Sequence, residues 1–379
     1  MSCPSSTPPE GYLASLAGFD RMTTARLASL LAHHDPVAAF HVAVGDAPPP
    51  PGIGALLAKD DTLAETWRRD GRLRDPAECW QRCVDTGTTV IAHDDPRYPA
   101  ALFHDPRAPA VLFVRGDLSM LDARRVGIVG TRNATQRGRE TAAEFGFELS
   151  ALGVTVVSGL AKGIDGAAHR GALAHPDARP LAVVGNGPDA PYPKQHASLW
   201  AEVSARGAVV SEWPPGTRPD AFRFPLRNRI LAALVEVLVV VESRERGGSL
   251  ITAKEAGERG VELFAVPGPV DSRASAGTNQ LLCDGAAPAT SVDDLMMALG
   301  LDQRRAGRTR FDGRRRPHGD AIDVLGHCRQ GARTIEQLML LLDRPIADTA
   351  MIVARLEHDG WLRETGGWFE TIDLWGDLA

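Results

Sequence analysis

Long apolar stretches, paired metal-binding motifs and an excess of positive charge are all missing from this sequence. The longest apolar run, from Val235 to Val241, contains Glu236 and is far shorter than the roughly 20 residues that span a bilayer. The five cysteines are scattered, and Cys79 and Cys83 have no matching CxxC or histidine pair to complete a zinc site. The first residues lack the basic and apolar regions of a signal peptide. We therefore expect a cytoplasmic protein with no membrane segment and no bound metal.

The charge balance and the missing nucleotide-binding motifs narrow the function further. The net charge is −6, so the chain lacks the overall basic field of many nucleic-acid binders, and any phosphate site must be local. No GxxxxGK[ST] loop is present, and GIVGTRNAT at residues 127–135 is not the GxGxxG fingerprint of dinucleotide folds. Neither an ATPase nor a dehydrogenase is indicated, and we expect no cofactor.

The centre of the chain alternates strand-like and helix-like segments. A length of 379 residues with 44% apolar composition is enough for two or three domains. Six apolar runs recur about every 27 residues, beginning near Val126, Val154, Leu181, Ala208, Glu236 and Val261. Strands and helices that alternate at this period predict βαβ units and a mostly parallel sheet covered on both faces. The fold class is therefore α/β, with a doubly wound core from about Val111 to Leu299.

One of the intervening helices, near residues 164–173, carries a histidine. Its apolar spacing places Asp165 and His169 on the polar side. His169 is either a general base or a capping or surface group, and no nucleophile of recognised spacing accompanies it. Asp165 would lie in the first turn, where the helix dipole favours a carboxylate. Catalysis by this helix is not indicated.

The flanks of the core differ from it in composition. Residues 1–94 are predicted as a small helical domain, split by a run of prolines that cannot continue a helix. Residues 95–300 form the core, and residues 301–317 are charged and nearly free of apolar side chains, which is typical of a flexible linker. Residues 318–379 predict three helices and a glycine-turned hairpin, the composition of a winged helix.

Glycine and cationic residues gather in the turns that follow the strands. In α/β sheets, ligands bind at the carboxyl ends of the strands. GTRNAT at residues 130–135 offers Arg132 and a capping Asn133 or Thr135, and SGLAKGID at residues 158–165 offers Lys162 just before a helix. Free N–H groups and the positive dipole end make both helix starts candidate phosphate sites. A single glycine after a strand is more often only a tight turn, but several cations at one edge of the sheet favour an anion site.

Further glycines and arginines fall at the same edge. GNGPDAPYPK at residues 185–194 adds two glycines and Lys194. FRFPLRNRILAAL at residues 222–234 gathers Arg223, Arg227 and Arg229 around a phenylalanine and a proline. RGGSLITAKEAG, which begins at Arg246, places two glycines before a helix as a second anion-binding arrangement. The linker arginines could also touch nucleic acid, although a charged linker is solvated by default.

Taken together, these motifs resemble those of the DNA-processing protein A (DprA, also called Smf) family. The matching pieces occur in one order through the core: YPAAL, PAVLFVRGD, VGIVGTRNAT, VVSGLAKGIDGAAHRGAL, LAVVGNGPDAPYP, VVSEWPPG, FPLRNRI, VVVESRERGGSLITAKEAGERG and FAVPGPVDSRASAGTNQLLCDGA. The resemblance implies an extended Rossmann-like core that binds single-stranded DNA, a small sterile-alpha-motif-like domain before it and a winged helix after it.

The resemblance also implies which residues bind DNA. The arginine of the GTR turn and the lysine of SGLAKGID line a positive pocket for the DNA backbone in such proteins, and here these are Arg132 and Lys162. The FPLRNRI segment would complete the site, although its arginines could equally hold the sheet edge by salt bridges. The full set of implied DNA-binding residues is Gly130, Thr131, Arg132, Ser158, Gly159, Lys162, Gly163, Arg227, Asn228 and Arg229.

The resemblance further implies a role in recombination rather than catalysis. Such proteins help to load the RecA recombinase onto single-stranded DNA during natural transformation, and they tend to form homodimers through the Rossmann-like domain. We therefore expect no catalytic residues. Single-stranded DNA, RecA and a second copy of the chain are the expected partners.

Two other function classes remain as alternatives. RERGGSLITAKEA loosely resembles the PGGxGTxxE loop of phosphoribohydrolases that cleave nucleoside monophosphates, which would make the protein an enzyme. A nucleotide-sensing regulator with a winged-helix output would need a basic recognition helix. DTAMIVARLEHDG at residues 348–360 is poor in cations, so a protein contact is at least as well supported as duplex reading.

Overall fold

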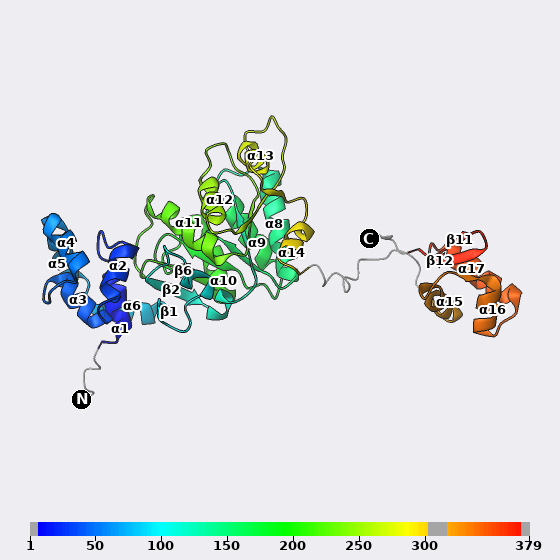
Figure 1. Cartoon of the computed structure of the whole chain (residues 1–379), viewed down its shortest axis with the longest axis horizontal. Helices are drawn as coiled ribbons and strands as arrows, with labels where there is room; N and C mark the ends of the chain where they lie inside the picture. The colour runs from blue at the N-terminus through cyan, green and yellow to red at the C-terminus, as the bar shows by residue number, and fades with distance from the viewer. Residues whose placement is uncertain (1–6, 302–316, 373–379) are drawn as a thin grey trace. The chain divides into compact units, whose positions relative to one another are not determined.

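The computed structural model describes residues 7–301 and 317–372, which fall into two compact units. The first unit holds the described residues up to 301 and the second those from 317 onward, and each is considered by itself (Figure 1). The predicted basic linker at residues 301–317 lies almost wholly outside the described residues. No helix in the two described ranges is long and apolar enough to cross a membrane.

The first unit begins with six helices that precede the sheet. They are α1 (Pro9–Ala17), α2 (Thr24–Leu31), α3 (Pro36–Val44), α4 (Pro51–Lys59), α5 (Asp61–Leu73) and α6 (Pro76–Asp85). Four of them start at a proline, whose fixed φ suits a first helical position and whose missing N–H is not needed there. The helices enclose a core around the fully buried Leu63 and Trp67.

A nine-stranded sheet forms the body of the same unit. Its strands are β1 (Thr88–Ala92), β2 (Val111–Gly116), β3 (Arg125–Val129), β4 (Thr155–Ser158), β5 (Leu181–Val184), β6 (Ala208–Ser211), β7 (Val237–Val240), β8 (Glu262–Ala265) and β9 (Ala287–Pro288). The order across the sheet is β1-β2-β6-β5-β4-β3-β7-β8-β9. Counted across the sheet in this order, the seven strands from β6 through β3 and β7 to β9 run parallel to one another. The other two strands, β1 and β2, run antiparallel to their neighbours. The predicted α/β class and mostly parallel sheet are therefore confirmed.

Helices cover both faces of this sheet. They are α7 (Ala100–Phe103), α8 (Gln136–Ala151), α9 (Ile164–Leu173), α10 (Ala197–Arg206), α11 (Arg223–Leu234), α12 (Gly248–Gly257), α13 (Ala276–Cys283) and α14 (Val292–Ala298), with short 3-10 turns at Leu118–Leu121 and Lys194–His196. One apolar cluster joins α11 and α12 to one face, while others join α8, α9, α10 and α14 to the opposite face (Figure 1). Strands covered on both faces need continuous apolar sequence, which explains the runs in the chain.

Helix α9 departs from its predicted orientation. Asp165 and His169, expected on an outward polar side, are both buried, and His169 is fully inaccessible. The reason is that this side of α9 faces Arg227 of α11, the end of β4 and His196 rather than solvent. The adjoining side is covered by α8, which lies so close that a Cβ on Gly171 would clash with the backbone of Ala143. Small residues on both helices permit this approach and leave Arg170 as the exposed side chain of the middle of α9.

The sheet also begins before residue 94, where the sequence placed the boundary between the helical domain and the core. Strand β1 was assigned by sequence to the helical region, but Thr88–Ala92 pairs antiparallel with β2 at the edge of the main sheet. The helical region and the core thus belong to one compact unit.

The second unit contains three helices and a small sheet. Its elements are α15 (Asp320–Arg329), β10 (Arg333–Thr334), α16 (Ile335–Leu342), α17 (Ile346–His358), β11 (Leu362–Thr365) and β12 (Trp368–Thr371). The two last strands form a hairpin, and β10 pairs with β12. Leu325, Leu338, Val353 and Leu356 fill its core. These are the elements expected of a winged helix, and that designation stays a prediction.

Candidate nucleic-acid interface

The candidate site lies where the strand order reverses, between β3 and β7. Crossovers from these adjacent strands leave in opposite directions, which opens a crevice at their carboxyl ends. The N–H of Thr131 donates to the Glu242 carbonyl at 2.8 Å and joins the two strand ends. A cavity of about 600 Å³ opens here, lined by the turn after β3, the beginning of α11 and the beginning of α12. Gly130, Thr131, Arg132, Arg227 and Asn228 from the predicted set line it.

The turns after β3 and β4 pack directly on each other. A Cβ on Gly163 would clash with the Thr131 carbonyl oxygen, and Gly163 has a φ of 77° that disfavours other residues. The N–H of Ile164 donates to the same Thr131 oxygen at 3.3 Å. This contact brings Arg132 and Lys162, both exposed, to one edge of the sheet, as predicted.

The start of α8, predicted as a phosphate site, is already occupied by a carboxylate of the chain itself. Thr135 caps the helix by accepting from the Gly138 N–H, as expected for one of the two candidate capping residues. The Glu242 carboxylate accepts from the N–H and the hydroxyl of Thr135 at 2.9 and 2.5 Å. This helix terminus is therefore not open to a phosphate, contrary to the expectation from sequence.

The turn before α9 is likewise closed by a buried carboxylate. Burial raises the pKa of Asp165, against the lowering effects of the Arg227 guanidinium and of backbone hydrogen bonds from Ala161 and Gly159. The backbone around Gly159 is thus engaged by Asp165, and Lys162 is the exposed cation of this turn. Ser158 is fully buried, and its hydroxyl donates to the Ile128 carbonyl at 2.6 Å.

Arg227 lies beneath the site rather than on its surface. It is 4% exposed, and burial lowers its pKa to about 10 although Asp165 acts to raise it. Its guanidinium donates to the Val183 carbonyl, and a side chain on Gly159 would clash with it. We conclude that Arg227 supports the turn after β4 and adds positive charge to the cavity from below.

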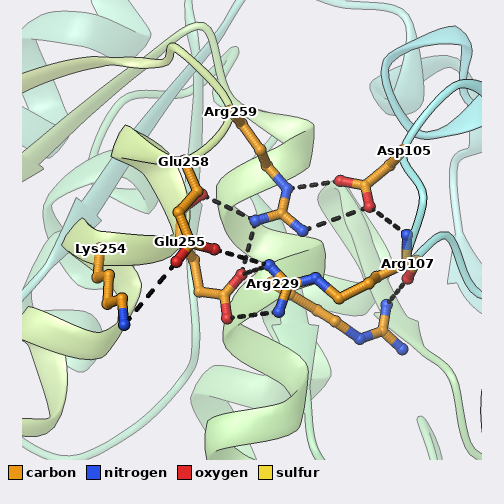
Figure 2. A network of polar contacts seen from close by, with 7 residues as sticks. All are labelled: Asp105, Arg107, Arg229, Lys254, Glu255, Glu258 and Arg259. Atoms are coloured by element: carbon orange, nitrogen blue, oxygen red, sulfur yellow. Dashed lines mark hydrogen bonds and ion pairs between the residues drawn. The ribbon is translucent and has the colours of Figure 1, made fainter.

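Arg229 does not line this cavity. It forms a salt bridge instead, which is the other role that the sequence allowed for the arginines of FPLRNRI. It pairs with Glu212 at 2.6 Å and donates to the Arg107 carbonyl at 2.5 Å. Figure 2 shows the surrounding ion pairs, in which Arg107 binds Glu255 and Arg259 binds Asp105. The network ties the loop before β2 to α11 and α12, and so fixes one wall of the cavity.

Aromatic side chains at the cavity were not predicted as part of the site. Tyr192 and Phe224 stack with centroids 5.4 Å apart and an interplanar angle of 22°. The Arg132 guanidinium lies 5.0 Å from the centre of the Phe224 ring. Tyr192 is 40% exposed, so a flat face remains open at the cavity rim. The sequence signal was an aromatic residue next to proline after each of two strands.

Arg244 and the start of α12 complete the opposite wall. Arg244 is exposed, follows β7 directly and lines the cavity, although sequence reasoning singled out only the glycines after it. Helix α12 begins at Gly248 with no side-chain cap, and a Cβ there would meet no atom within 4 Å. Of the predicted anion-binding helix starts, this one is open.

His169 has no route to a substrate in this arrangement. It is fully buried, and burial lowers its pKa to about 3, so it is neutral at physiological pH. Neither ring nitrogen has a hydrogen-bond partner within the described part of the chain. A catalytic role for His169 therefore finds no support in its position.

Comparison with known proteins places the α/β core in one family. A family model described as DNA recombination-mediator protein A matches residues 89–300. The DNA processing protein DprA of Bacillus subtilis is 38% identical over 218 residues, which cover 57% of this chain and 72% of that protein. Protein Smf of Escherichia coli is 39% identical over 211 residues, 55% of this chain and 56% of its own length, so the match spans only about half of that relative.

Solved structures agree with this assignment. The X-ray structure of DprA from Streptococcus pneumoniae has a TM-score of 0.62 at 29% identity, covering 76% of this chain and 97% of that one. DprA from Helicobacter pylori, whose structure was described for its single-stranded DNA binding mode, has a TM-score of 0.52 at 27% identity, covering 57% of this chain and 96% of that one. The strand order, the paired glycine turns and these matches lead to one conclusion: the chain belongs to the DNA recombination-mediator protein A family.

Proposed function

We propose that this protein binds single-stranded DNA at the cavity between β3 and β7 and acts as a recombination mediator. The observation that carries the proposal is the meeting of Arg132 with the stacked rings of Tyr192 and Phe224 in the lining of one cavity. Lys162 does not line the cavity, but it is exposed on the turn after β4, which packs against the turn of Arg132. Cations neutralise backbone phosphates, and aromatic faces stack with unpaired bases. Bases in a duplex are stacked already, so this combination favours single strands.

The arrangement favours binding without sequence preference. Arg132 and Lys162 are exposed point contacts suited to phosphates, which carry no base information. Stacking on the exposed Tyr192, which Phe224 supports from behind, accepts every base because each base has a π face. The Helicobacter pylori relative, described for its single-stranded DNA binding mode, supports the same ligand here.

We extend the proposal to the loading of the RecA recombinase during the processing of transforming DNA. Family membership supports this role, and a protein that holds a strand at one local site leaves the rest of the strand open to a recombinase. We propose that it works in the cytoplasm as a homodimer, without a cofactor or a chemical step of its own. The cavity supplies cations and aromatic rings, which neutralise charge and stack but do not transfer protons.

The phosphoribohydrolase alternative is not favoured by the position of its acidic residue. Glu255 is the first carboxylate after the glycine pair that ends at Gly248. It is held by Arg107 at 2.5 Å and by Arg259 at 2.6 Å, within the network of Figure 2, and it does not line the cavity. A carboxylate engaged in this way is not placed to act on a nucleotide bound between β3 and β7.

A titration with single-stranded and duplex DNA of the same sequence, at two salt concentrations, tests the proposal. We expect the single strand to bind more tightly and its affinity to fall with salt, since phosphate neutralisation releases counterions. Equal affinity for both forms, or no binding at low salt, would contradict it. A separate experiment tests the loading step: RecA is added to the bound strand, and the rate at which RecA hydrolyses ATP in a DNA-dependent manner is measured.

A further inference from the structure

A second cavity, of about 990 Å³, lies between the N-terminal helices and the α/β core. One wall comes from the residues around α2 and the end of α5, and the other from the loop after β6 and from α11. Three of its apolar side chains are open to solvent: Leu73, Phe222 and Leu226 are 71%, 57% and 48% exposed. A concave surface that leaves large apolar groups exposed is typical of a binding site.

Arginine and aromatic rings meet in this cavity as they do in the first. The Arg223 guanidinium lies 5.0 Å from the centre of the Phe222 ring and 5.8 Å from that of Trp213. In the first cavity, Arg132 lies at the same 5.0 Å from Phe224. Guanidinium planes and aromatic faces are the groups on which unpaired bases stack.

The charge of the cavity lining is locally positive although the whole chain is acidic. Five arginines and three carboxylates line it: Arg21, Arg74, Arg107, Arg223 and Arg229, with Asp20, Asp70 and Glu212. The carboxylates are engaged, since Asp20 and Asp70 lie 4.0 and 3.1 Å from Arg69 and Glu212 pairs with Arg229. Arg74 and Arg223 have no ion pair with a described carboxylate, which leaves two cations for an anionic ligand.

The beginning of α11 separates the two cavities and belongs to both. Phe224 and Asn228 line the first cavity, whereas Phe222 and Leu226, on the neighbouring face of the helix, line the second. The residues that lead into the helix, 218–222, are exposed. A strand bound at the first cavity therefore reaches the second by passing over this short segment.

The loop that presents Trp213 is held by hydrogen bonds within the chain. The backbone N–H of Trp213 donates to the Ser211 hydroxyl at 3.0 Å, and the backbone N–H of Gly216 donates to the Asp189 carboxylate at 2.8 Å. The Gly187 N–H donates to the Thr217 carbonyl at 2.9 Å. Preorganisation of this kind lowers the entropic cost of binding.

We propose that the second cavity continues the single-strand path, with bases stacked on Trp213 and Phe222 and phosphates held by Arg223 and Arg74. The inference rests on the proposed function of the first cavity and adds a second contact region to it. Single-stranded nucleic acid is favoured over a protein ligand because the two cavities share one helix and repeat the same pairing of arginine with aromatic rings.

Oligothymidylates of two lengths, about 4 and about 16 nucleotides, separate the two cavities, since the shorter one fills only one of them. The variant Phe222→Ala with Arg223→Gln changes the second cavity alone. We expect it to bind the short oligonucleotide as the parent does and the long one about tenfold more weakly, because each lost stacked base is worth a factor of this order. Lys59→Gln, at an exposed position on α4, is the matched control, and melting temperatures verify folding.

The outcomes distinguish this inference from the proposed function. If the parent protein binds neither oligonucleotide, the proposed function fails and the inference with it. If the parent binds both but the double variant retains full affinity for the long one, or loses affinity for both equally, only the second cavity is excluded. Photocrosslinking of a long 5-iodouracil oligonucleotide to the parent protein is an independent check, and we expect crosslinks at Trp213 or Phe222. Crosslinks confined to Tyr192 and Phe224 would overturn the inference.

Discussion

Gly163 lies against the carbonyl oxygen of Thr131, so that the turn after β4 rests on the turn after β3 without an intervening side chain. The two turns carry Lys162 and Arg132, and the spacing of their backbones is therefore set by this contact. The exposed side chains themselves keep their rotamer freedom.

Replacement of Gly163 by alanine tests this contact. We expect the variant to lose about 2 kcal/mol of unfolding free energy, because the residue has a positive φ and the new methyl group clashes with Thr131. Single-strand affinity should fall as the turns separate. The measurement is denaturant unfolding alongside DNA titration. Gly257→Ala is the control, since a Cβ there meets nothing and stability should hold or rise. Equal behaviour of the two variants would contradict the contact's role.

Charge reversal of the two rim cations tests the proposed interface. Lys162→Glu and Arg132→Glu should each weaken single-strand binding by at least tenfold without lowering the melting temperature, because both side chains are exposed. Lys162→Gln should flatten the log–log salt dependence by about 0.7. Arg132→Gln should cost more than Lys162→Gln, since it also removes the stack on Phe224. Lys59→Gln serves as the control, and parent-like binding by both reversals would exclude the phosphate contacts.

Arg229 offers a test that separates fold from function. Arg229→Met leaves the Glu212 carboxylate without its partner in a largely buried position, and we expect a loss of about 3 kcal/mol in unfolding free energy. Addition of Glu212→Gln should restore part of it, because the unpaired charge is removed. The folded variant should bind an oligonucleotide of about 4 nucleotides like the parent. A loss of this affinity with no loss of stability would return Arg229 to the DNA site.

The buried imidazole of His169 predicts a dependence of stability on pH. Its pKa is lowered to about 3 in the folded protein from 6.5, so the unfolded chain binds the extra proton between these values. The contribution of His169 to stability is thus full above pH 6.5 and decreases as the pH falls toward 3. We expect a loss of about 1.4 kcal/mol on going from pH 7.5 to 5.5.

His169→Gln isolates this effect from other titrating groups. The raised pKa of Asp165 acts in the opposite sense, since a folded carboxyl that protonates more readily gains stability as the pH falls. The difference between parent and variant in denaturant unfolding at the two pH values cancels the Asp165 contribution. A parent and a variant that respond to pH identically would show that His169 is solvated.

The strand spacing and the glycine turns of the core could be read from sequence because they depend on local pattern. Six apolar runs predicted β3 to β8, although not β1, β2 or β9, and the residues around Arg132 and Lys162 were correctly placed at one edge. The sequence could not show which charged side chains contact which partners in the folded protein. Glu242 reaches Thr135 across 107 positions of the chain, and Asp165 points inward beside the buried Arg227 of α11. Such pairings follow from tertiary placement, which no local pattern encodes.

The arginines of FPLRNRI illustrate the same limit. Arg227 and Arg229 lie two positions apart and looked equivalent, yet the helix places one under the first cavity and the other beside Glu212. The stacked pair of Tyr192 and Phe224 comes from segments that follow different strands. An aromatic residue beside a proline is a weak signal until the sheet brings two of them together.

The Glu242 carboxylate at the start of α8 disfavours some ligands of this protein. In a doubly wound fold, that helix start is where the phosphate of a free nucleotide would sit. Here the chain supplies its own negative charge, so a mononucleotide meets repulsion where it would need attraction. A DNA strand depends less on any one phosphate-binding site because its charge is distributed along many phosphates. We therefore expect free nucleotides to compete only weakly with single-stranded DNA for this protein.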